Sequence, residues 1–313
     1  MQNAASSPPQ DAAALAGNAP LIAGSARCVW PAQALLGEGT CWSVRAQALY
    51  WVDILGHCLH RYTPATQAQD SWQFDEELSA VAERRDGAGL VLTLRHDVVF
   101  FDPETGARQT LCRTESDKPG NRCNDGKCDA AGRLWASTID FDCTHATGAI
   151  YRVSASGACQ AMHPGYVVNN GPTWSADGLT LYLNDTVQGR VQAFDFDPAA
   201  GTLARERTWL QFAAHDGLPD GMTTDAHGRI WIAHWGGACV SCHDPDSAQE
   251  LARVPLPTSH ITNCAFGGAD LRTLFISSAR TGLSAQQLHD QPLAGALFCV
   301  DTHCQGLAPA QFG

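Results

Sequence analysis

The sequence predicts an all-β fold, a six-bladed β-propeller with four-stranded antiparallel blades. Three observations predict it: a strand-turn-strand pattern that recurs at a nearly constant spacing, 29 Gly and 16 Pro that suit many tight turns, and little helical periodicity. At 313 residues the chain exceeds the usual size of a single core. All-β domains reach that length when the core is distributed over repeats, so we expect one repetitive domain.

The chain begins with residues 1–24, which are rich in Ala, Ser, Pro and Gln and have no hydrophobic periodicity. We expect this stretch to be a disordered or loosely packed tail. The repeating units begin near Cys28, and residues 25–313 are therefore predicted to form the single propeller domain.

The repeats align on the apolar or aromatic residue that follows each central turn. These residues are Tyr50, Leu92, Trp135, Tyr182, Trp231 and Phe275. The successive spacings of 42, 43, 47, 49 and 44 residues match the roughly 40 to 50-residue period of propeller blades. Each alignment point is followed by another apolar stretch and a turn, which predicts the outer strands. Helical periodicity is weak outside residues 283–290.

The clearest unit is LPDGMTTDAHGRIWIAHWGG, residues 218–237. An Asp-Gly turn at Asp220 and Gly221 is predicted to lead into a short apolar-polar alternation. A second turn over residues 225–228 reverses the chain, and residues 230–233 are predicted to form a buried strand.

Polar residues stand 11 or 12 positions before five of the six alignment points. They are Glu38, Asn124, Asn170, Asp220 and Asn263, whereas the second repeat has Ala80 and Val81 there. Because the first strand of every blade lines the central channel, equivalent positions converge near one axis. We therefore expect a ring of oxygen donors at one channel mouth.

Turn chemistry is the alternative explanation of this ring. Asn-Gly and Asp-Gly pairs are strong turn formers, and they account for three of the five positions. They do not account for Glu38, because Glu has no special role in turns. Two acids with amide oxygens predict a site for a hard divalent cation such as Ca²⁺ or Mg²⁺, while Mn²⁺, Fe²⁺ and Zn²⁺ remain open.

The charge and cysteine content exclude several classes of partner. The formal net charge is -12 without a Lys or Arg cluster, which argues against nucleic acid or an anionic membrane and favours a small ligand. No apolar run approaches the roughly 18 residues that span a bilayer. The 13 cysteines are odd in number and no basic leader precedes them, so we expect reduced thiols and a cytoplasmic protein. A zinc site of Cys239 and Cys242 with Cys123 and Cys128 is the alternative to buried thiols.

Other motifs narrow the chemistry further. The chain lacks G-x-S-x-G and H-E-x-x-H, so a serine esterase or zincin is unsupported. Arg122 lies two residues before Asn124 and would share its face in an extended segment, where it could donate to a ligand or form an ion pair at the rim. A second polar position recurs three residues after the alignment points, and we expect it to bond neighbouring blades or cap the channel. It is occupied by Asp53, Thr138, Asp185, His234 and Ser278.

Four motifs resemble the gluconolactonase/regucalcin-like sugar lactonase family, and the later part of the chain is similar to bacterial aldonolactonases such as xylonolactonases and arabinonolactonases. They are LGEGTCW with LYWVDI (36–54), NRCNDGKCDAAGRLWAST (121–138), NNGPTWSADGLTLYLNDT (169–186) and LPDGMTTDAHGRIWIAHWGG (218–237). The resemblance covers about residues 28–300. It implies a six-bladed propeller with one divalent cation in the channel.

The resemblance also implies roles for individual residues. It places the cation on Glu38, Asn170 and Asp220, with Asp220 as the catalytic acid/base, and the substrate on Arg122 and Asn124. A further substrate contact would fall near Asp142, where this chain has Asp in place of a longer Glu in a variable loop. The implied activity is hydrolysis of a sugar lactone to the aldonic acid.

The sequence is also compatible with other functions. They are a non-catalytic Ca²⁺-binding regulator, a protein-interaction platform, and a metal-dependent hydrolase of another ester such as a phosphotriester. The lactone, the native metal and the oligomeric state are not readable from the sequence.

Overall fold

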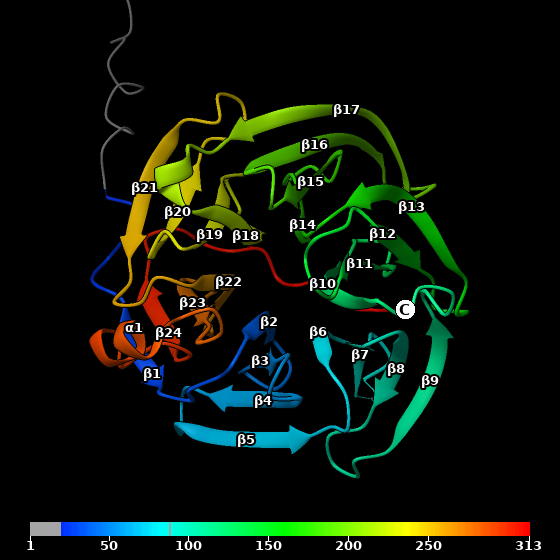
Figure 1. The fold of residues 1–313 in the computed structure, drawn as a ribbon, viewed down its shortest axis with the longest axis horizontal. Coiled ribbons are helices and arrows are strands. Elements are labelled where there is room, and N and C mark those ends of the chain that lie inside the picture. Colours follow the sequence, from blue (N-terminus) through cyan, green and yellow to red (C-terminus); the bar gives the residue numbers. More distant parts are fainter. Residues whose placement is uncertain (1–19, 88) are drawn as a thin grey trace, which may run out of the picture.

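The computed structural model describes residues 20–87 and 89–313. Six sheets of four antiparallel strands are arranged around a central axis (Figure 1). The predicted six-bladed propeller is confirmed. In the described part of the chain, no helix is long and apolar enough to cross a membrane.

In blades 1 to 5 the strands run in sequence order from the axis outward. Blade 1 comprises β2 (Gly37–Ser43), β3 (Ala48–Asp53), β4 (Cys58–Thr63) and β5 (Ala68–Gln73). Blade 2 comprises β6 (Leu78–Glu83), β7 (Leu90–Leu94), β8 (Asp97–Phe101) and β9 (Arg108–Arg113). Blade 3 comprises β10 (Asn121–Cys128), β11 (Leu134–Asp140), β12 (Gly148–Val153) and β13 (Cys159–Tyr166). Blade 4 comprises β14 (Asn169–Trp174), β15 (Thr180–Asp185), β16 (Arg190–Asp197) and β17 (Thr202–Gln211). Blade 5 comprises β18 (Leu218–Thr224), β19 (Ile230–Trp235), β20 (Cys239–His243) and β21 (Glu250–Pro255).

Blade 6 joins the two ends of the chain. It comprises β22 (Ile261–Gly267), β23 (Thr273–Ser278), β24 (Leu297–Asp301) and, outermost, β1 (Arg27–Trp30). Residues just before β1 are also held, because Ile22 forms a bridge with Thr302 and packs against the core beside Leu21. Ordered structure therefore begins before residue 25, while residues 1–19 of the predicted tail lie outside the described residues.

All six alignment residues lie in the second strand of their blade, and the helix expected near 283–290 is α1 (Ala285–Asp290). Ser284 caps this helix by accepting a hydrogen bond from the backbone N–H of Gln287. Burial decreases from the axis outward: β2 is buried throughout, whereas β5 is mostly exposed. The inner strands are therefore the part of each blade that can present side chains to the axis.

The hydrophobic core is divided into six clusters, one between each pair of neighbouring blades. Between blades 6 and 1, for example, Trp42 stacks on Phe275 with ring centroids 5.6 Å apart. This distribution lets 313 residues fold as one domain. All 13 cysteines lie within the described residues and are free thiols, nine of them being partly or fully enclosed in these clusters or their edges.

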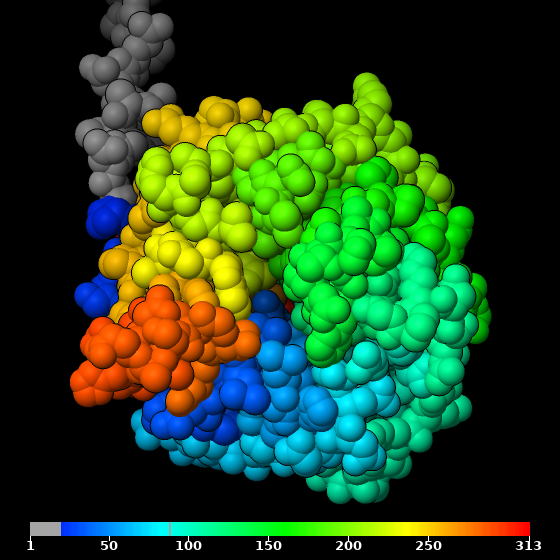
Figure 2. All heavy atoms as spheres, viewed as in Figure 1, coloured from blue at the N-terminus to red at the C-terminus, as the bar shows by residue number. Residues whose placement is uncertain are grey.

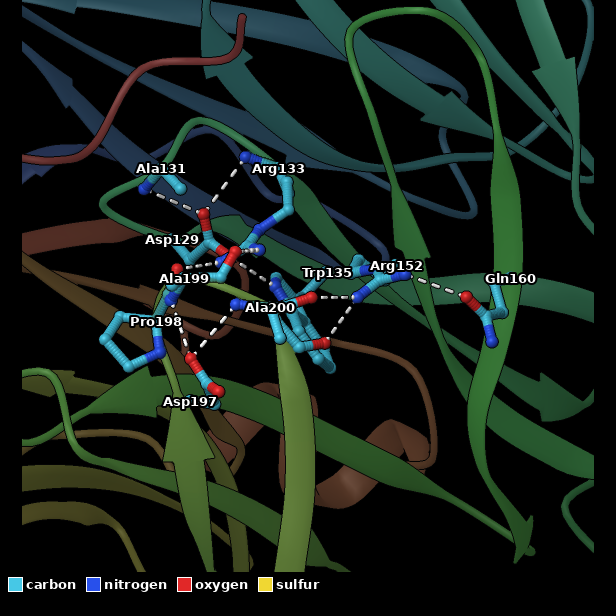
Figure 3. Close-up of polar contacts among 11 residues, drawn as sticks. Asp129, Ala131, Arg133, Trp135, Arg152, Gln160, Asp197, Pro198, Ala199 and Ala200 are labelled. Atoms are coloured by element: carbon cyan, nitrogen blue, oxygen red, sulfur yellow. Dashed lines mark hydrogen bonds and ion pairs between the residues drawn. The ribbon is translucent and has the colours of Figure 1, made fainter.

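A buried aspartate anchors the turn between the first two strands in blades 3 and 5. Asp129 accepts hydrogen bonds from Arg133 Nε (2.7 Å) and Trp135 Nε1 (2.8 Å) (Figure 3). The same arrangement occurs in blade 5, with Asp225, Arg229 and Trp231 in the equivalent places. These aspartates have structural partners within their own blade.

Blade 3 is also tied to the turn that joins β16 and β17 of blade 4. Arg133 donates to the carbonyl oxygen of Pro198 (2.7 Å), and Arg152 donates to those of Ala200 and Gly201 (both 2.6 Å) (Figure 3). Arg133 also donates to the carbonyl oxygen of Ala199 (3.2 Å), so four carbonyl groups of one turn accept from two guanidinium groups, which fixes the outer parts of the two blades to each other.

The C-terminal segment crosses the end of the channel at which the inner strands finish, as the red trace in Figure 1 shows. Ala226 donates its backbone N–H to Gln305, Arg85 donates to Phe312, and Gly313 donates to Gly132. Because these contacts reach blades 2, 3 and 5, the segment ties distant blades together. The loops that carry α1 and η1 (Ala214–Asp216) lie at the opposite end.

Candidate metal centre and active site

The five polar residues of the predicted ring lie on the inner strands β2, β10, β14, β18 and β22. Each of these strands has an irregular register at the ring position, as between Glu38 and Cys41 or between Pro219 and Met222. A β-bulge re-aims a side chain and bends its strand. The predicted Asp-Gly turn at Asp220 is therefore wrong, because Asp220 and Gly221 lie inside β18.

Glycines next to the ring residues allow the inner strands to approach one another closely. Gly171 has φ +58°, and a Cβ atom there would lie 2.9 Å from the carbonyl oxygen of Asp220. A Cβ atom at Gly221 would lie 2.3 Å from Nδ2 of Asn263. These glycines, which the sequence suggested as turn residues, instead allow neighbouring inner strands to lie close together around the axis.

The structure brings the predicted ring together as a network of buried side chains. Nδ2 of Asn124 donates to Oδ1 of Asn170 at 2.5 Å, and Nδ2 of Asn263 donates to Oε2 of Glu38 at 3.1 Å. The Glu38 carboxyl group is near enough to Asp220 to raise the pKa of its carboxyl group. The five side chains are at most 6% exposed.

Two of these buried groups are acids that disfavour each other's ionisation. Burial raises the pKa of Asp220, and the carboxyl groups of Glu38 and Asp125 raise it further. Burial likewise raises the pKa of Glu38, with Asp125 adding to the shift. Adjacent carboxyl groups in a desolvated site hold a proton unless a cation compensates their charge.

The carboxyl and amide oxygens of the site suit a hard cation. Oδ1 of Asp220 is buried and has no hydrogen-bond partner, and Oε2 is the only oxygen of Glu38 that accepts hydrogen bonds among the described residues. Asn170 is held in place by donating its Nδ2 to Thr186 Oγ1 at 3.0 Å. Carboxylate and amide oxygens are the ligands that Ca²⁺ and Mg²⁺ prefer, so Glu38, Asn170 and Asp220 fit a divalent cation with places left for water or substrate.

Arg122 lies beside this set on β10. Its Nη1 donates to Oδ1 of Asn124 at 2.7 Å and to the carbonyl oxygen of Cys123 at 2.9 Å. Burial lowers the pKa of Arg122, and none of the ion pairs in residues 20–87 and 89–313 involves it. A buried guanidinium without a carboxylate partner is free to bind an oxygen-rich ligand.

Asp142 is placed differently from the other predicted site residues. It is exposed in the loop after β11, next to Phe141, whose ring centroid lies 5.9 Å from Cζ of Arg122. The loop therefore stands at the rim of the channel mouth. Figure 2 shows this face, with a hollow at the centre between the segments coloured green, yellow and orange.

The comparisons with known proteins agree with this geometry. The family model described as SMP-30/Gluconolactonase/LRE-like region matches residues 36–280, which is more than half of the chain. The chain belongs to the SMP-30/gluconolactonase/LRE-like family.

Members of this family align with nearly all of the chain. A 6-deoxy-6-sulfogluconolactonase of Pseudomonas putida is 35% identical over 291 residues, which cover 91% of this chain and 98% of the relative. The regucalcin of Oryctolagus cuniculus is 32% identical over 278 residues, 87% and 93% of the two chains. The crystal structure of a calcium-binding regucalcin from Agrobacterium tumefaciens matches with a TM-score of 0.89 at 27% identity, covering 95% of this chain and 100% of that one.

One buried acid near the ring, Asp125, was not predicted from the sequence. It is 2% exposed and lies on the axis between Asn124 and Gly126. Asp125 lies within an Asn-Asp-Gly tripeptide, and such a tripeptide is also typical of a turn, so the sequence did not distinguish a buried acid from a turn residue. Residue 184 was missed too: Asn184 Nδ2 donates to the carbonyl oxygen of Asp220 and so holds the β18 bulge.

The second recurrent polar position is structural. Asp53 accepts from the backbone N–H groups of Leu35 and Leu36 (both 2.9 Å), and His234 pairs through Nε2 with Ser241 Oγ at 2.6 Å. These bonds stay within one blade or the segment leading into it, so the expectation that the position joins neighbouring blades is wrong. Burial lowers the pKa of His234 to about 4.

Two further observations limit where a site can be. Within the described ranges, no three His, Cys, Asp or Glu side chains are grouped to hold a metal, which removes the cysteine zinc site. A pocket of about 340 Å³ lies at the other end of the channel, where Thr40, Lys127 and Thr173 face the C-terminal segment 307–310. The ring residues do not line this pocket. The buried acids lie in the ring, so we place the candidate active site at the ring and not in this pocket.

Proposed function

We propose that this protein is a metal-dependent sugar lactonase that hydrolyses an aldonolactone to the aldonic acid. The observation that carries the proposal is the buried pair Glu38 and Asp220 beside Arg122. Among the described residues, Oδ1 of Asp220 accepts no hydrogen bond and Arg122 forms no ion pair. The relative from Pseudomonas putida, which is named a sulfogluconolactonase, supports the lactone as substrate class.

We assign the cation to Glu38, Asn170 and Asp220. A divalent cation bound there would polarise the lactone carbonyl as a Lewis acid and lower the pKa of water. The chain itself supplies three oxygen ligands from three different blades. Their positions are set by hydrogen bonds from Asn263 to Glu38, from Thr186 to the carbonyl of Pro219, and between Asn170 and Asn124.

We assign the proton transfers to Asp220. One carboxyl oxygen would accept the proton of the attacking water and return it to the ring oxygen as the C–O bond of the lactone breaks. A raised pKa suits this role, because a general base works best when its pKa is near the working pH. Binding a cation makes a carboxylate a poorer base, so Asp220 would ligate through one oxygen and transfer protons through the other.

We assign the orientation of the sugar to Arg122 and Asn124, which lie two residues apart on β10. The Arg122 guanidinium has donors left beyond its bonds to Asn124 and Cys123. These donors can hold substrate hydroxyl or carbonyl oxygens and so position the reacting carbonyl. We assign Asp142 a contact to the substrate at the rim of the channel mouth.

We also propose a reducing, cytoplasmic location, which the 13 free thiols support.

A calcium-binding regulator without catalysis is the second candidate. It is favoured by one observation, the similarity to the Agrobacterium tumefaciens structure described as a calcium-binding protein. Both candidates use the same three ligands, and only the first requires Asp220 to transfer a proton.

Acid release from a panel of glucono-, galactono-, xylono- and arabinonolactones tests the proposal. The panel is run on chelator-treated protein and on the same protein with Ca²⁺, Mg²⁺, Mn²⁺ or Zn²⁺ restored, with metal content measured on each sample. We expect turnover of at least one lactone that depends on the added ion. Ion binding without acid release from any lactone would favour the regulator.

A further inference from the structure

Asp125 is a buried carboxylate that the proposed reaction does not use. It is 2% exposed and follows Asn124 in the bulge of β10. Its backbone is clamped by Ser137, whose Oγ accepts from the N–H of Asp125 at 2.8 Å and donates to its carbonyl oxygen at 3.0 Å. The side chain is therefore presented to the axis from a fixed backbone position.

Both carboxylate oxygens of Asp125 are occupied by donors. Oδ1 accepts from the backbone N–H of Gly126 at 2.7 Å. Oδ2 accepts from the backbone N–H of Gly171 at 2.7 Å and from Nδ2 of Asn263 at 3.3 Å. Two of these donors come from other blades, so the side chain joins β10 to β14 and β22.

Each of these two links ends beside a proposed cation ligand. Gly171 directly follows Asn170, and its N–H bond to Asp125 fixes the peptide from which the Asn170 side chain departs. Asn263 shares its Nδ2 group between Asp125 and Oε2 of Glu38, which is 3.1 Å away. The Asn263 amide is itself oriented by Thr40 Oγ1, which donates to Oδ1 at 2.8 Å.

A neutral residue cannot reproduce this arrangement. Asn in place of Asp125 would turn one of the two oxygens into an NH₂ donor, which would face either the N–H of Gly126 or the donors of Gly171 and Asn263. A third carboxyl group near Glu38 and Asp220 also adds charge that disfavours their ionisation, so it is costly in a fold without a cation. Asp129, four residues later and equally buried, has instead an Arg and a Trp of its own blade as partners.

We propose that Asp125 is the positioning residue of the cation site, holding Asn170 through Gly171 and holding Glu38 through Asn263. This inference rests on the proposed cation site. The Asp125 side chain would thereby set the distance between Asn170 of blade 4 and Glu38 of blade 1.

Calorimetric titration of Ca²⁺, and separately Mn²⁺, into chelator-treated full-length protein tests the proposal. The variants are Asp125→Asn and the matched control Asp129→Asn, which removes a carboxylate of the same blade and burial. Loss of a partner that orients metal ligands costs about 10 to 100-fold in affinity, so we expect Asp125→Asn to raise the dissociation constant by that factor. Asp129→Asn should lower the unfolding temperature, because it breaks the bonds to Arg133 and Trp135. Its dissociation constant should stay within about twofold of wild type, because Asp129 orients none of the proposed ligands.

Activity supplies a second readout. The turnover lost by Asp125→Asn should recover as the cation concentration is raised toward saturation. Because a bound cation also stabilises the fold, the unfolding temperature of the cation-free variant is measured to distinguish weakened binding from a folding defect. If Asp125→Asn does not fold, Asn263→Ser cuts the link to Glu38 from the other side and should weaken binding in the same direction.

The outcomes test the cation site and the positioning role of Asp125 separately. If wild-type protein binds no divalent cation, the proposed cation site is overturned and this inference with it. If wild-type protein binds and the folded variants at 125 or 263 bind equally well, the site stands and the positioning role is overturned.

Discussion

Glu38 of blade 1 and Asp220 of blade 5 bring two buried carboxyl groups to the propeller axis, where the Glu38 carboxyl group raises the pKa of Asp220. Each raises the cost of ionising the other, and no described residue donates a hydrogen bond to Oδ1 of Asp220. The pair destabilises the fold locally, and a bound cation would relieve this destabilisation.

Replacing Asp220 by Asn should separate function from stability. General acid-base groups contribute about 10² to 10⁴-fold, so lactone turnover should fall by a factor in that range. The unfolding temperature of the chelated protein should stay the same or rise, because a buried carboxyl group with a raised pKa is removed. Asp225→Asn is the matched control in the same blade: it breaks bonds to Arg229 and Trp231, so its stability should fall and its turnover should persist. Full turnover in Asp220→Asn would remove its proposed role.

Cation affinity should increase with pH. Burial raises the pKa values of both Glu38 and Asp220, so the folded, cation-free protein keeps protons that the unfolded chain has lost. These groups therefore stabilise the cation-free fold below the ordinary carboxyl pKa, and that contribution is lost as the pH rises through their raised values.

Because a cation needs the deprotonated ligands, the rise in unfolding temperature on adding Ca²⁺ should be larger at pH 8.5 than at pH 5.5. Thermal unfolding with and without Ca²⁺ at the two pH values measures this. The Glu38→Gln variant, which has one fewer titrating ligand, should show a smaller difference. An equal Ca²⁺ effect at both pH values in wild-type protein would contradict the assignment of these acids as ligands.

Arg122 and Asp142 should differ in what they contribute to substrate binding. Arg122→Lys loses the planar donor fork at a buried position, so KM should rise by about tenfold or more. Asp142→Asn alters an exposed carboxylate at the rim, where charge interactions are worth at most about 1 kcal/mol, so its effect should stay below about fivefold and fall on KM. Steady-state kinetics on one lactone measures both. A larger loss in Asp142→Asn than in Arg122→Lys would reverse their assignment.

Gly171→Ala should damage the site more than an equivalent change elsewhere. Gly171 and Gly178 both have positive φ, +58° and +72°, and a Cβ atom would meet the Asp220 carbonyl at 2.9 Å in the first case and open space in the second. Gly178→Ala should cost about 1 kcal/mol through φ strain alone, and Gly171→Ala about 2 to 3 kcal/mol more through displacement of β18. Chemical denaturation gives both values. Equal costs would show that the close approach between the strands is not needed.

Local pattern was sufficient to predict the blades. Trp135 and Trp231 repeat at a spacing set by four strands and their turns, so their place in the second strand of each blade follows from sequence alone. The same periodicity placed Glu38 and Asn170 at equivalent points of inner strands. It did not show that Asp220-Gly221 is a bulge, because turns and bulges draw on the same residues and differ only in what the strand pairs with.

Relations between distant segments were not readable in this way. The pairing of β1 with β24 joins the two ends of the chain, and no local signal specifies it. The role of Asp125 likewise depends on Gly171 and Asn263, which reach it only when three inner strands meet.

The sequence by itself determined the number of blades and the equivalent inner-strand positions of Glu38, Asn170 and Asp220, because both follow from the period of the strands. Only the tertiary structure decided that the Glu38 carboxyl group raises the pKa of Asp220, that Arg122 forms no ion pair among the described residues, and that Asp125 joins β10 to β14 and β22. Contacts across the axis depend on bulge geometry and on strand separations of a few ångströms, and those distances are set by all six inter-blade clusters acting together.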